Sequence, residues 1–490
     1  MDKKAKPLEL ACDGHPQVAG VSEGVQVAIY RPQVLETPVL EGQGAVDGGG
    51  VSIYGSVIRD NGIFRMWYQA TPQRPLTAGD TVLVGCVESD DGLSWRRPSH
   101  RIMEWEGRRD HHLTDLPFHC PSVVIDPQAP PQARYRAFGC TGRRKLADLP
   151  AGFPLPVEAW YAYHSAHSAD GLHWTVDGPA PAWPWADVIT SVRDPWAGRI
   201  RVALKRNGRS AGLFRRRFCT ADYAAGRAGE AVTGLIPDEF DDQAAQARGF
   251  ASADYYGLGW MPGPTVTVGF LWIFRHQAPL GADGVRRYGK IGCVDVSLVY
   301  QTEPGGRWQH LPGRPDWLAT RDMPEWASGA LYTAAYPLEV GDETWLYFTG
   351  TADRHGWRGE GVERDGVEAG RSRIGLARWP AGRLMGYESR LRGIVQLEPR
   401  QGAKDDNRLC LNLVTRPGGR VRAQLLDDGG QPIPGYAFDD CEPLTGDHLK
   451  TDVRWRGKSF GAEQRPTAVQ LELQGATLYG FEFTVAGIGA

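Results

Sequence analysis

The chain has 490 residues, and its 62 glycines, 35 prolines and 17 tryptophans indicate a turn-rich all-β protein built from short strands. The formal net charge is −3, and lysine and arginine are spread along the chain, which argues against a nucleic-acid partner. No stretch approaches the run of about 18 apolar residues that a membrane helix needs, and residues 1–16 lack the apolar segment of a signal peptide. We therefore expect a cytoplasmic protein with no membrane partner.

The eight cysteines lack Cys-x-x-Cys spacing, and several lie inside apolar, strand-like runs. This pattern predicts buried free thiols that serve packing. Since no His/Cys cluster has ligand spacing, we expect no catalytic metal and no cofactor, while a structural Ca²⁺ held by Asp side chains and carbonyls remains open.

A heptapeptide is written twice in the first half of the chain. SDDGLSW at residues 89–95 returns as SADGLHW at residues 168–174, 79 residues later. Asp-Gly favours a tight turn, because glycine tolerates positive φ and aspartate can bond its own backbone. Each copy follows a β-rich run and ends on a tryptophan. The motif therefore predicts a repeated outer hairpin and marks architecture rather than chemistry.

Five short apolar or aromatic strands recur along the chain at intervals of 70, 65, 69 and 76 residues, with another strand before each and, as a rule, a third after it. Such units cannot bury both faces alone and must stack around a central channel, which predicts a five-bladed β-propeller over residues 1–395. Residues 396–490 lose the repeat and predict a small β-sandwich. The five strands are FRMWYQA around Arg65, RYRAFGC around Tyr135, RIRVALK around Ile200, TVGFLWIF around Gly269 and ETWLYFTG around Trp345.

Candidate site residues follow from aligning the five blades. The first strand of each blade lines the central channel, and the residues at the start of these strands converge on one axial pocket. Blades three and four place Asp187 and Asp254 in the same register, and blade five offers Glu325 upstream. Cleavage of a glycosidic bond needs one carboxyl to protonate the leaving oxygen and another to attack or to activate water. These three are the predicted catalytic residues. The predicted substrate contacts are Asp47, Tyr54, Asp115, His119, Trp185, Tyr255, Tyr332 and His355.

The RDP tripeptide at residues 193–195 is similar to a catalytic signature of fructosidases. It falls after the channel-lining strand, where Asp-Pro followed by Trp-Ala-Gly makes an ordinary turn. We therefore assign Asp187, and not Asp194, to the channel entrance.

Several segments resemble bacterial proteins of the glycoside hydrolase family 32-like group, within the furanosidase superfamily that includes families 32, 43 and 68. They are YGSVIRDNGIFRMWY, PSVVIDPQAPPQARYRAFG, SADGLHW, ADYYG and LLDDGGQPIPGYAFDDC. The resemblance implies five blades followed by a β-sandwich. The family-32 pattern places a nucleophilic Asp in its first strand, where this chain has VSIYGSV without a carboxylate, so the resemblance implies that the acids are redistributed.

The sequence favours a glycosidase that cleaves a small glycoside or oligosaccharide. Two alternatives stay open. A propeller phosphorylase or transferase would need a basic phosphate pocket, for which Arg193, Lys205 and Arg206 are candidates. A non-catalytic carbohydrate-binding propeller would need no acid pair. A homo-oligomer is compatible with any of the three.

Overall fold

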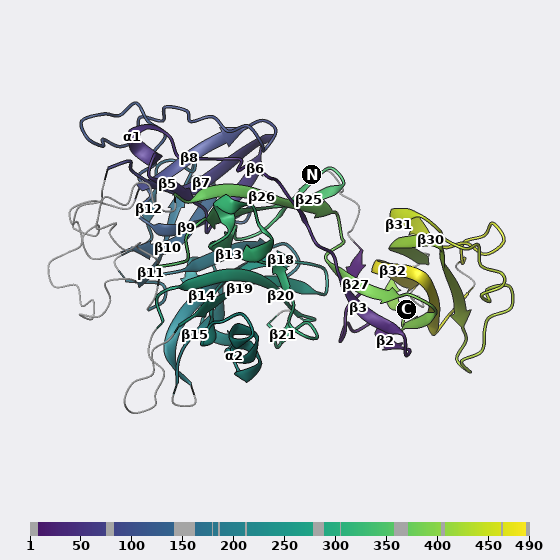
Figure 1. The fold of residues 1–490 in the computed structure, drawn as a ribbon. Coiled ribbons are helices and arrows are strands. Elements are labelled where there is room, and N and C mark those ends of the chain that lie inside the picture. The colour runs from purple at the N-terminus through teal and green to yellow at the C-terminus, as the bar shows by residue number, and fades with distance from the viewer. Residues whose placement is uncertain are drawn as a thin grey trace.

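Nearly every described residue that belongs to a regular element lies in a β-strand (Figure 1). The computed structural model describes residues 8–74, 83–141, 162–178, 180–184, 187–210, 213–277, 289–303, 305–356, 371–402, 407–461 and 464–486. The strands form a five-bladed propeller and a β-sandwich, which confirms the predicted fold class.

The first three blades are separate antiparallel sheets. In the first, β5 (Gly50–Ser52) and β6 (Val57–Asp60) share one edge of β7 (Ile63–Thr71), and β8 (Leu83–Ser89) takes the other. The second runs β9 (His119–Ile125), β10 (Tyr135–Thr141), β11 (Ala162–Ser168) and β12 (Thr175–Val176). The third runs β13 (Ile189–Asp194), β14 (Arg199–Ser210) and β15 (Leu213–Ala224), edged by β16 (Arg227–Ala228) and β17 (Val232–Leu235).

Blades four and five are joined by one parallel pair of residues, Val294 and Ala330. Blade four runs β18 (Ser252–Pro262), β19 (Thr267–His276) and β20 (Gly292–Gln301), edged by β21 (Gln309–His310) and β22 (Asp316–Leu318). Blade five runs β23 (Ala330–Thr333) and β24 (Leu338–Val340) on one edge of β25 (Glu343–Thr351), then β26 (Arg373–Pro380). Its outermost strand is β4 (Gln33–Val34), which comes from near the N-terminus.

Short helices lie between the strands. Among the described residues they are α1 (Gly44–Asp47), α2 (Glu239–Gln246) and three 3₁₀ turns at Pro131–Ala133, Thr320–Asp322 and Glu325–Ala327. The N-cap residue of α2 is Asp238, whose side chain accepts from the N–H groups of Phe240 and Asp241. This helix is part of the connection between β17 of blade three and β18 of blade four.

The inner strands close into a ring, because each hydrogen-bonds to the next blade near the middle of the molecule. Gly55 allows the closest approach, since a Cβ there would lie 1.7 Å from the carbonyl oxygen of Pro121. Around the ring the bonds run from Val123 N to Ser56 Oγ (3.1 Å), Ser191 N to Ser122 Oγ (2.8 Å), Thr190 Oγ1 to Leu258 O, Trp260 N to Ala335 O (2.7 Å) and Ala335 N to Gly55 O (2.6 Å).

The two copies of the heptapeptide form the same turn. In the first, Asp91 accepts from the N–H groups of Leu93 and Ser94, and in the second Asp170 accepts from those of Leu172 and His173. Each turn also docks on the preceding blade. The Tyr347 hydroxyl donates to Gly92 O and the Trp67 indole donates to Gly171 O, both at 2.7 Å. The prediction that the motif is architectural is confirmed, and its role is to join blades.

The β-sandwich collects strands from both ends of the chain (Figure 1, yellow and purple). Its central strand β32 (Ala468–Ala486) pairs with β27 (Met385–Ser389) and β28 (Gly393–Leu397), so the predicted boundary at residues 395/396 passes through β28. The remaining strands are β1 (Glu9–Leu10), β2 (Val18–Val21), β3 (Val25–Ile29), β29 (Arg400–Gly402), β30 (Arg408–Leu426) and β31 (Asp447–Asp452).

All eight cysteines are buried and free, as predicted. Among the described residues, no helix has both the length and the apolar character needed to cross a membrane.

Candidate active site

Side chains from all five blades meet where the inner strands begin. We call this group of side chains the axial cluster. Its aromatic rings contact one another in sequence: the ring centroids of Tyr54 and Tyr332 are 5.1 Å apart, and those of Tyr256 and His355 are 4.8 Å apart. His119 lies 6.3 Å from Tyr54, and Tyr332 lies 5.8 Å from Tyr256. The axial cluster comprises Tyr54, His119, Asp187, Lys205, Tyr256, Tyr332 and His355.

These side chains are positioned by irregular stretches of backbone at the starts of the strands. Tyr54 lies in the break between β5 and β6, and Tyr256 lies at a shift of register in β18. His119 begins β9 beside another irregularity, and the next residue, Cys120, has φ 53°. Bulges re-aim side chains and are common beside functional sites, and a left-handed non-glycine residue stores strain. The inner strands therefore have bulges and backbone strain near their starts, which a strand with a purely structural role does not need.

Asp187 is the carboxylate of the axial cluster. It forms an ion pair with the ammonium of Lys205, whose side chain is only 1% exposed, whereas the Asp187 side chain is 37% exposed. The same ammonium lies 3.8 Å from the centre of the Tyr256 ring. Burial raises the pKa of Asp187, but the charge and hydrogen bond of Lys205, together with His119 and a backbone N–H, lower it, and the pKa ends below its usual value. Asp187 is thus an ionised, accessible carboxylate at neutral pH.

Two neutral imidazoles flank this carboxylate. Burial lowers the pKa of His355 to about 4, with the positive charges of Lys205 and Arg216 acting in the same direction. Burial also lowers the pKa of His119. The Tyr332 hydroxyl lies 2.8 Å from Nδ1 of His355. In the tautomer in which this nitrogen accepts, Nε2 carries a proton and can donate a hydrogen bond to a ligand.

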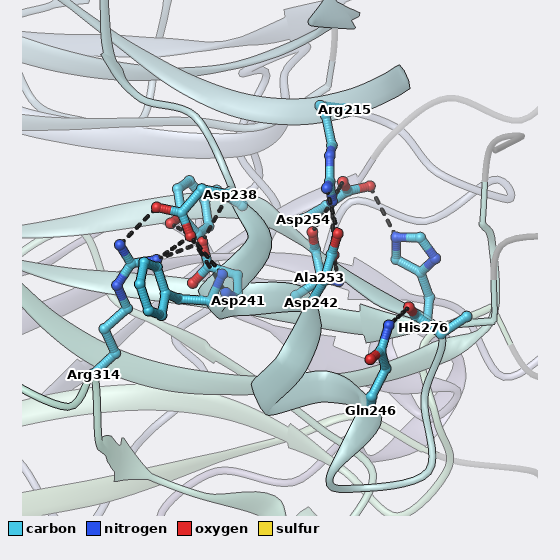
Figure 2. Close-up of polar contacts among 12 residues, drawn as sticks. Arg215, Asp238, Asp241, Asp242, Gln246, Ala253, Asp254, His276 and Arg314 are labelled. Carbon is cyan, nitrogen blue, oxygen red and sulfur yellow. Dashed lines mark hydrogen bonds and ion pairs between the residues drawn. The ribbon is translucent and has the colours of Figure 1, made fainter. Parts of the chain in front are cut away.

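Asp254 lies beside the axial cluster and is held by cationic partners. Its Oδ2 accepts from Arg216 at 2.6 Å. The same oxygen lies 3.0 Å from His276 Nε2, and Arg215 lies 4.0 Å from Oδ1 (Figure 2). The Asp254 side chain is 2% exposed. Phe274 connects the surroundings of Asp254 with the axial cluster. The centroid of its ring lies 4.9 Å from that of His276, which contacts Asp254, and 5.1 Å from that of His355, which belongs to the cluster. Within the described ranges, no hydrogen bond or ion pair joins Asp254 to Asp187 or to its partner Lys205.

Tyr255 points away from the axial cluster. Its hydroxyl donates to Asp241 at 2.6 Å and lies 3.0 Å from His310, in the core between blades three and four. Asp241 also accepts from Arg314, so the tyrosine belongs to the ion network at the start of α2 (Figure 2). Neighbouring residues of a strand face opposite sides, which separates Tyr255 from Asp254.

Three predicted carboxylates lie elsewhere. Asp47 is fully buried and accepts from the Tyr68 hydroxyl at 2.6 Å and from Arg97 at 2.9 Å. Asp115 is exposed and accepts from the N–H of Trp174 at 2.7 Å, which fixes the second heptapeptide. Glu325 is exposed on a 3₁₀ turn. The structure therefore gives the first two carboxylates local structural partners.

Trp185 lies outside the described residues. The RDP segment forms the turn expected of it, since Asp194 accepts from the N–H groups of Trp196 and Ala197, both at 2.9 Å. Sequence reasoning did not identify Arg216 or His276. Their signal is a charged or polar side chain inside an otherwise apolar strand, which must find a partner when the strand is buried.

Within the part of the chain that the structure describes, no group of three or more His, Cys, Asp or Glu side chains is arranged to hold a metal ion. The carboxylate, imidazoles and aromatic rings of the axial cluster are themselves suited to acid–base chemistry and stacking.

No family model matches the chain, and no curated protein matches it. Solved structures do match. A thermostable family-43 glycoside hydrolase is 9% identical, with a TM-score of 0.45 over 72% of this chain and 96% of its own. A family-43 arabinoxylan arabinofuranohydrolase from Bacillus subtilis is 9% identical, with a TM-score of 0.41 over 92% and 97%. The Bombyx mori family-32 β-fructofuranosidase is 10% identical, with a TM-score of 0.35 over 94% and 95%. At these values the likeness carries nothing about the reaction.

Proposed function

We propose that the protein is a glycoside hydrolase that cleaves a small glycoside or oligosaccharide at the axial cluster. One observation carries the proposal: the partly exposed carboxylate of Asp187 is held ionised by a buried lysine and surrounded by rings from the other four blades. Apolar sugar faces stack on aromatic rings, and neutral imidazoles exchange hydrogen bonds with sugar hydroxyls. Buried free thiols support the proposed cytoplasmic location.

The charge of Asp187 suggests its role. An ionised carboxylate either attacks the anomeric carbon or takes a proton from the attacking water, while the leaving oxygen gains a proton from a second group. Asp254 is our first candidate for a second carboxylate, because Phe274 links its surroundings to the cluster. Nucleophilic attack gives retention and base catalysis gives inversion, so NMR of the first anomer released distinguishes the two roles.

Turnover of a panel of nitrophenyl glycosides tests the proposal. We expect Asp187→Asn to lose about 10²- to 10⁴-fold in turnover, because it keeps the shape of the side chain and removes the charge. Asp90→Asn is the matched control, since Asp90 is an exposed surface residue paired with Arg96. Wild-type turnover in Asp187→Asn, with an unchanged melting curve, would remove Asp187 from the reaction. Sugar binding without turnover by the wild type would favour the non-catalytic alternative.

A further inference from the structure

His355 reaches the axial cluster from a short segment that leads from blade five onto blade four. This segment follows β25, and the N–H of Gly292, the first residue of β20, donates to His355 O at 3.1 Å. The next residue, Gly356, has φ 72°, and a Cβ there would lie 2.3 Å from Lys290 O. The backbone of His355 is therefore held against blade four.

The imidazole ring of His355 packs on two aromatic residues of blade four. Its centroid lies 4.8 Å from that of Tyr256 and 5.1 Å from that of Phe274, and both pairs meet edge to face. Because burial lowers the pKa of His355 to about 4, the ring is neutral at pH 7. A neutral imidazole has one nitrogen that donates and one that accepts, and the hydrogen bond made by one nitrogen decides the role of the other.

Tyr332 decides this role. Its hydroxyl lies 2.8 Å from Nδ1 of His355, and within the described ranges it has no other hydrogen-bond partner. Tyr332 is 3% exposed, with the ring centroids of Tyr54 and Trp272 at 5.1 and 5.5 Å. If Nδ1 carried the proton, this buried O–H would have no acceptor, which is costly. The hydroxyl therefore donates to Nδ1, and the proton of the imidazole is on Nε2.

The Nε2 atom is accessible to a ligand. Within the described ranges it neither makes a hydrogen bond nor is buried without one, and the His355 side chain is only half-buried. Asp187, in the same cluster, is an accessible carboxylate and accepts hydrogen bonds. The axial cluster thus offers a ligand a donor at His355 and an acceptor at Asp187.

We propose that Tyr332 is a positioning residue that presents His355 to the substrate as a hydrogen-bond donor. The Nε2–H group binds an oxygen atom of the sugar, since hydroxyl and ether oxygens accept hydrogen bonds. Tyr332 leaves almost no surface for a ligand and acts through His355. The sugar as ligand rests on the proposed function, whereas the tautomer of His355 is measurable without any ligand.

NMR of the whole protein with ¹⁵N-labelled histidine at pH 7 tests the tautomer. His355→Gln identifies the resonances of this ring by removing them. In the wild type we expect Nδ1 to have the chemical shift of an unprotonated nitrogen and Nε2 that of a protonated one. Tyr332→Phe keeps the aromatic ring but removes the donor to Nδ1, so the second tautomer becomes populated and the two ¹⁵N shifts move toward each other. A protonated Nδ1 in the wild type overturns the proposal, even if Tyr332→Phe does not fold.

Tyr336→Phe is the matched control. The Tyr336 hydroxyl donates to a backbone carbonyl, Val123 O, at 3.4 Å, so its loss leaves the ¹⁵N shifts of His355 unchanged. The proposal is also overturned if Tyr332→Phe keeps the wild-type shifts, because the hydroxyl then does not set the tautomer. Equal changes in both variants mean a general loosening of the propeller, and they overturn it too.

Kinetics on the nitrophenyl glycosides separate positioning from a structural role. We expect Tyr332→Phe to raise KM by roughly 2- to 10-fold, as for one neutral hydrogen bond, with kcat nearly unchanged. In a double-mutant cycle with His355→Phe, Tyr332→Phe raises KM no further, because the nitrogen that it positions is gone. Additive effects would mean that Tyr332 does not act through His355. If no glycoside is turned over although NMR shows the expected tautomers, the proposed function fails and the positioning by Tyr332 stands.

Discussion

Lys205 controls the charge state of the axial cluster, since its buried ammonium contacts both Asp187 and the Tyr256 ring. Because Lys205 lowers the pKa of Asp187, the wild type keeps an ionised carboxylate down to pH values below the usual aspartate range. We predict that Lys205→Met raises this pKa and moves the acid limb of the kcat/KM profile to higher pH. Arg199→Met is the control, because Arg199 begins the same strand as Lys205 and pairs with Asp222 instead. Acid limbs that coincide in the wild type and Lys205→Met would show that Lys205 does not set the ionisation.

Asp47 provides a contrasting case of a structural carboxylate. Burial raises its pKa, but hydrogen bonds from His112, Tyr68 and the N–H of Gln43 lower it below the usual value. The stabilisation is therefore present above the unfolded pKa of about 3.9 and is lost as pH falls through the folded value.

We predict that Asp47→Asn lowers the free energy of unfolding by about 3 kcal/mol at pH 7, the cost of breaking a buried pair. The difference from the wild type begins to shrink below about pH 4, where the unfolded carboxylate takes up a proton, and reaches its minimum once the folded carboxylate is protonated as well. Denaturant unfolding at several pH values measures this, with Asp90→Asn as the control. A deficit that is constant with pH would mean that shape, and not charge, matters at this position.

At the scale of elements, the heptapeptide turns are the contacts that fix one blade to the next. Gly171 has φ 79°, and a Cβ there would lie 2.7 Å from the Trp67 ring. Gly198 has φ 67° and open space around its Cβ position. Gly171→Ala therefore combines backbone strain with a clash, whereas Gly198→Ala has strain alone.

We predict that Gly198→Ala costs about 1 kcal/mol of unfolding free energy and that Gly171→Ala costs about 1–3 kcal/mol more, the usual penalty of overpacking. Equilibrium denaturation of the two variants measures the difference. If both lose the same amount, the turn does not dock tightly on Trp67, and the joining role of the heptapeptide is wrong.

The sequence predicts strands better than it predicts their faces. The spacing of apolar runs located the second strand of every blade, because five units of similar length must repeat the same hairpins. Alternation along β18 places Tyr255 and Asp254 on opposite faces, so only Tyr256 returns to the side of the axial cluster. The ion pair of Asp187 with Lys205 depends on pairing between strands, which no local pattern in a single sequence reveals.

At the scale of the molecule, the least predictable feature is how the two ends of the chain are used. The two-residue strand β4 closes blade five, and β2 and β3 pair with β28 and β27 of the sandwich. Such short segments carry almost no pattern of their own, and they become strands because the edges of distant strands need partners. The linker between β3 and β4 is fixed to blade four, where the Trp317 indole donates to Tyr30 O at 2.9 Å.

This arrangement predicts different behaviour for two truncated chains that both lack β32. A chain of residues 1–395 keeps β2, β3 and β27 without the strand on which their sheet is built, which exposes Tyr387 and Val395, both buried in the whole protein. A chain of residues 32–381 begins just before β4, ends just after β26 and leaves all five blades closed.

Exposed apolar surface and unpaired strand edges promote association. We therefore expect the longer chain to aggregate and the shorter one to be monomeric with a cooperative melting transition, measured by size-exclusion chromatography and calorimetry. If residues 1–395 give the monodisperse protein and residues 32–381 do not, the propeller domain extends to residue 395, and the terminal strands belong to it rather than to the sandwich.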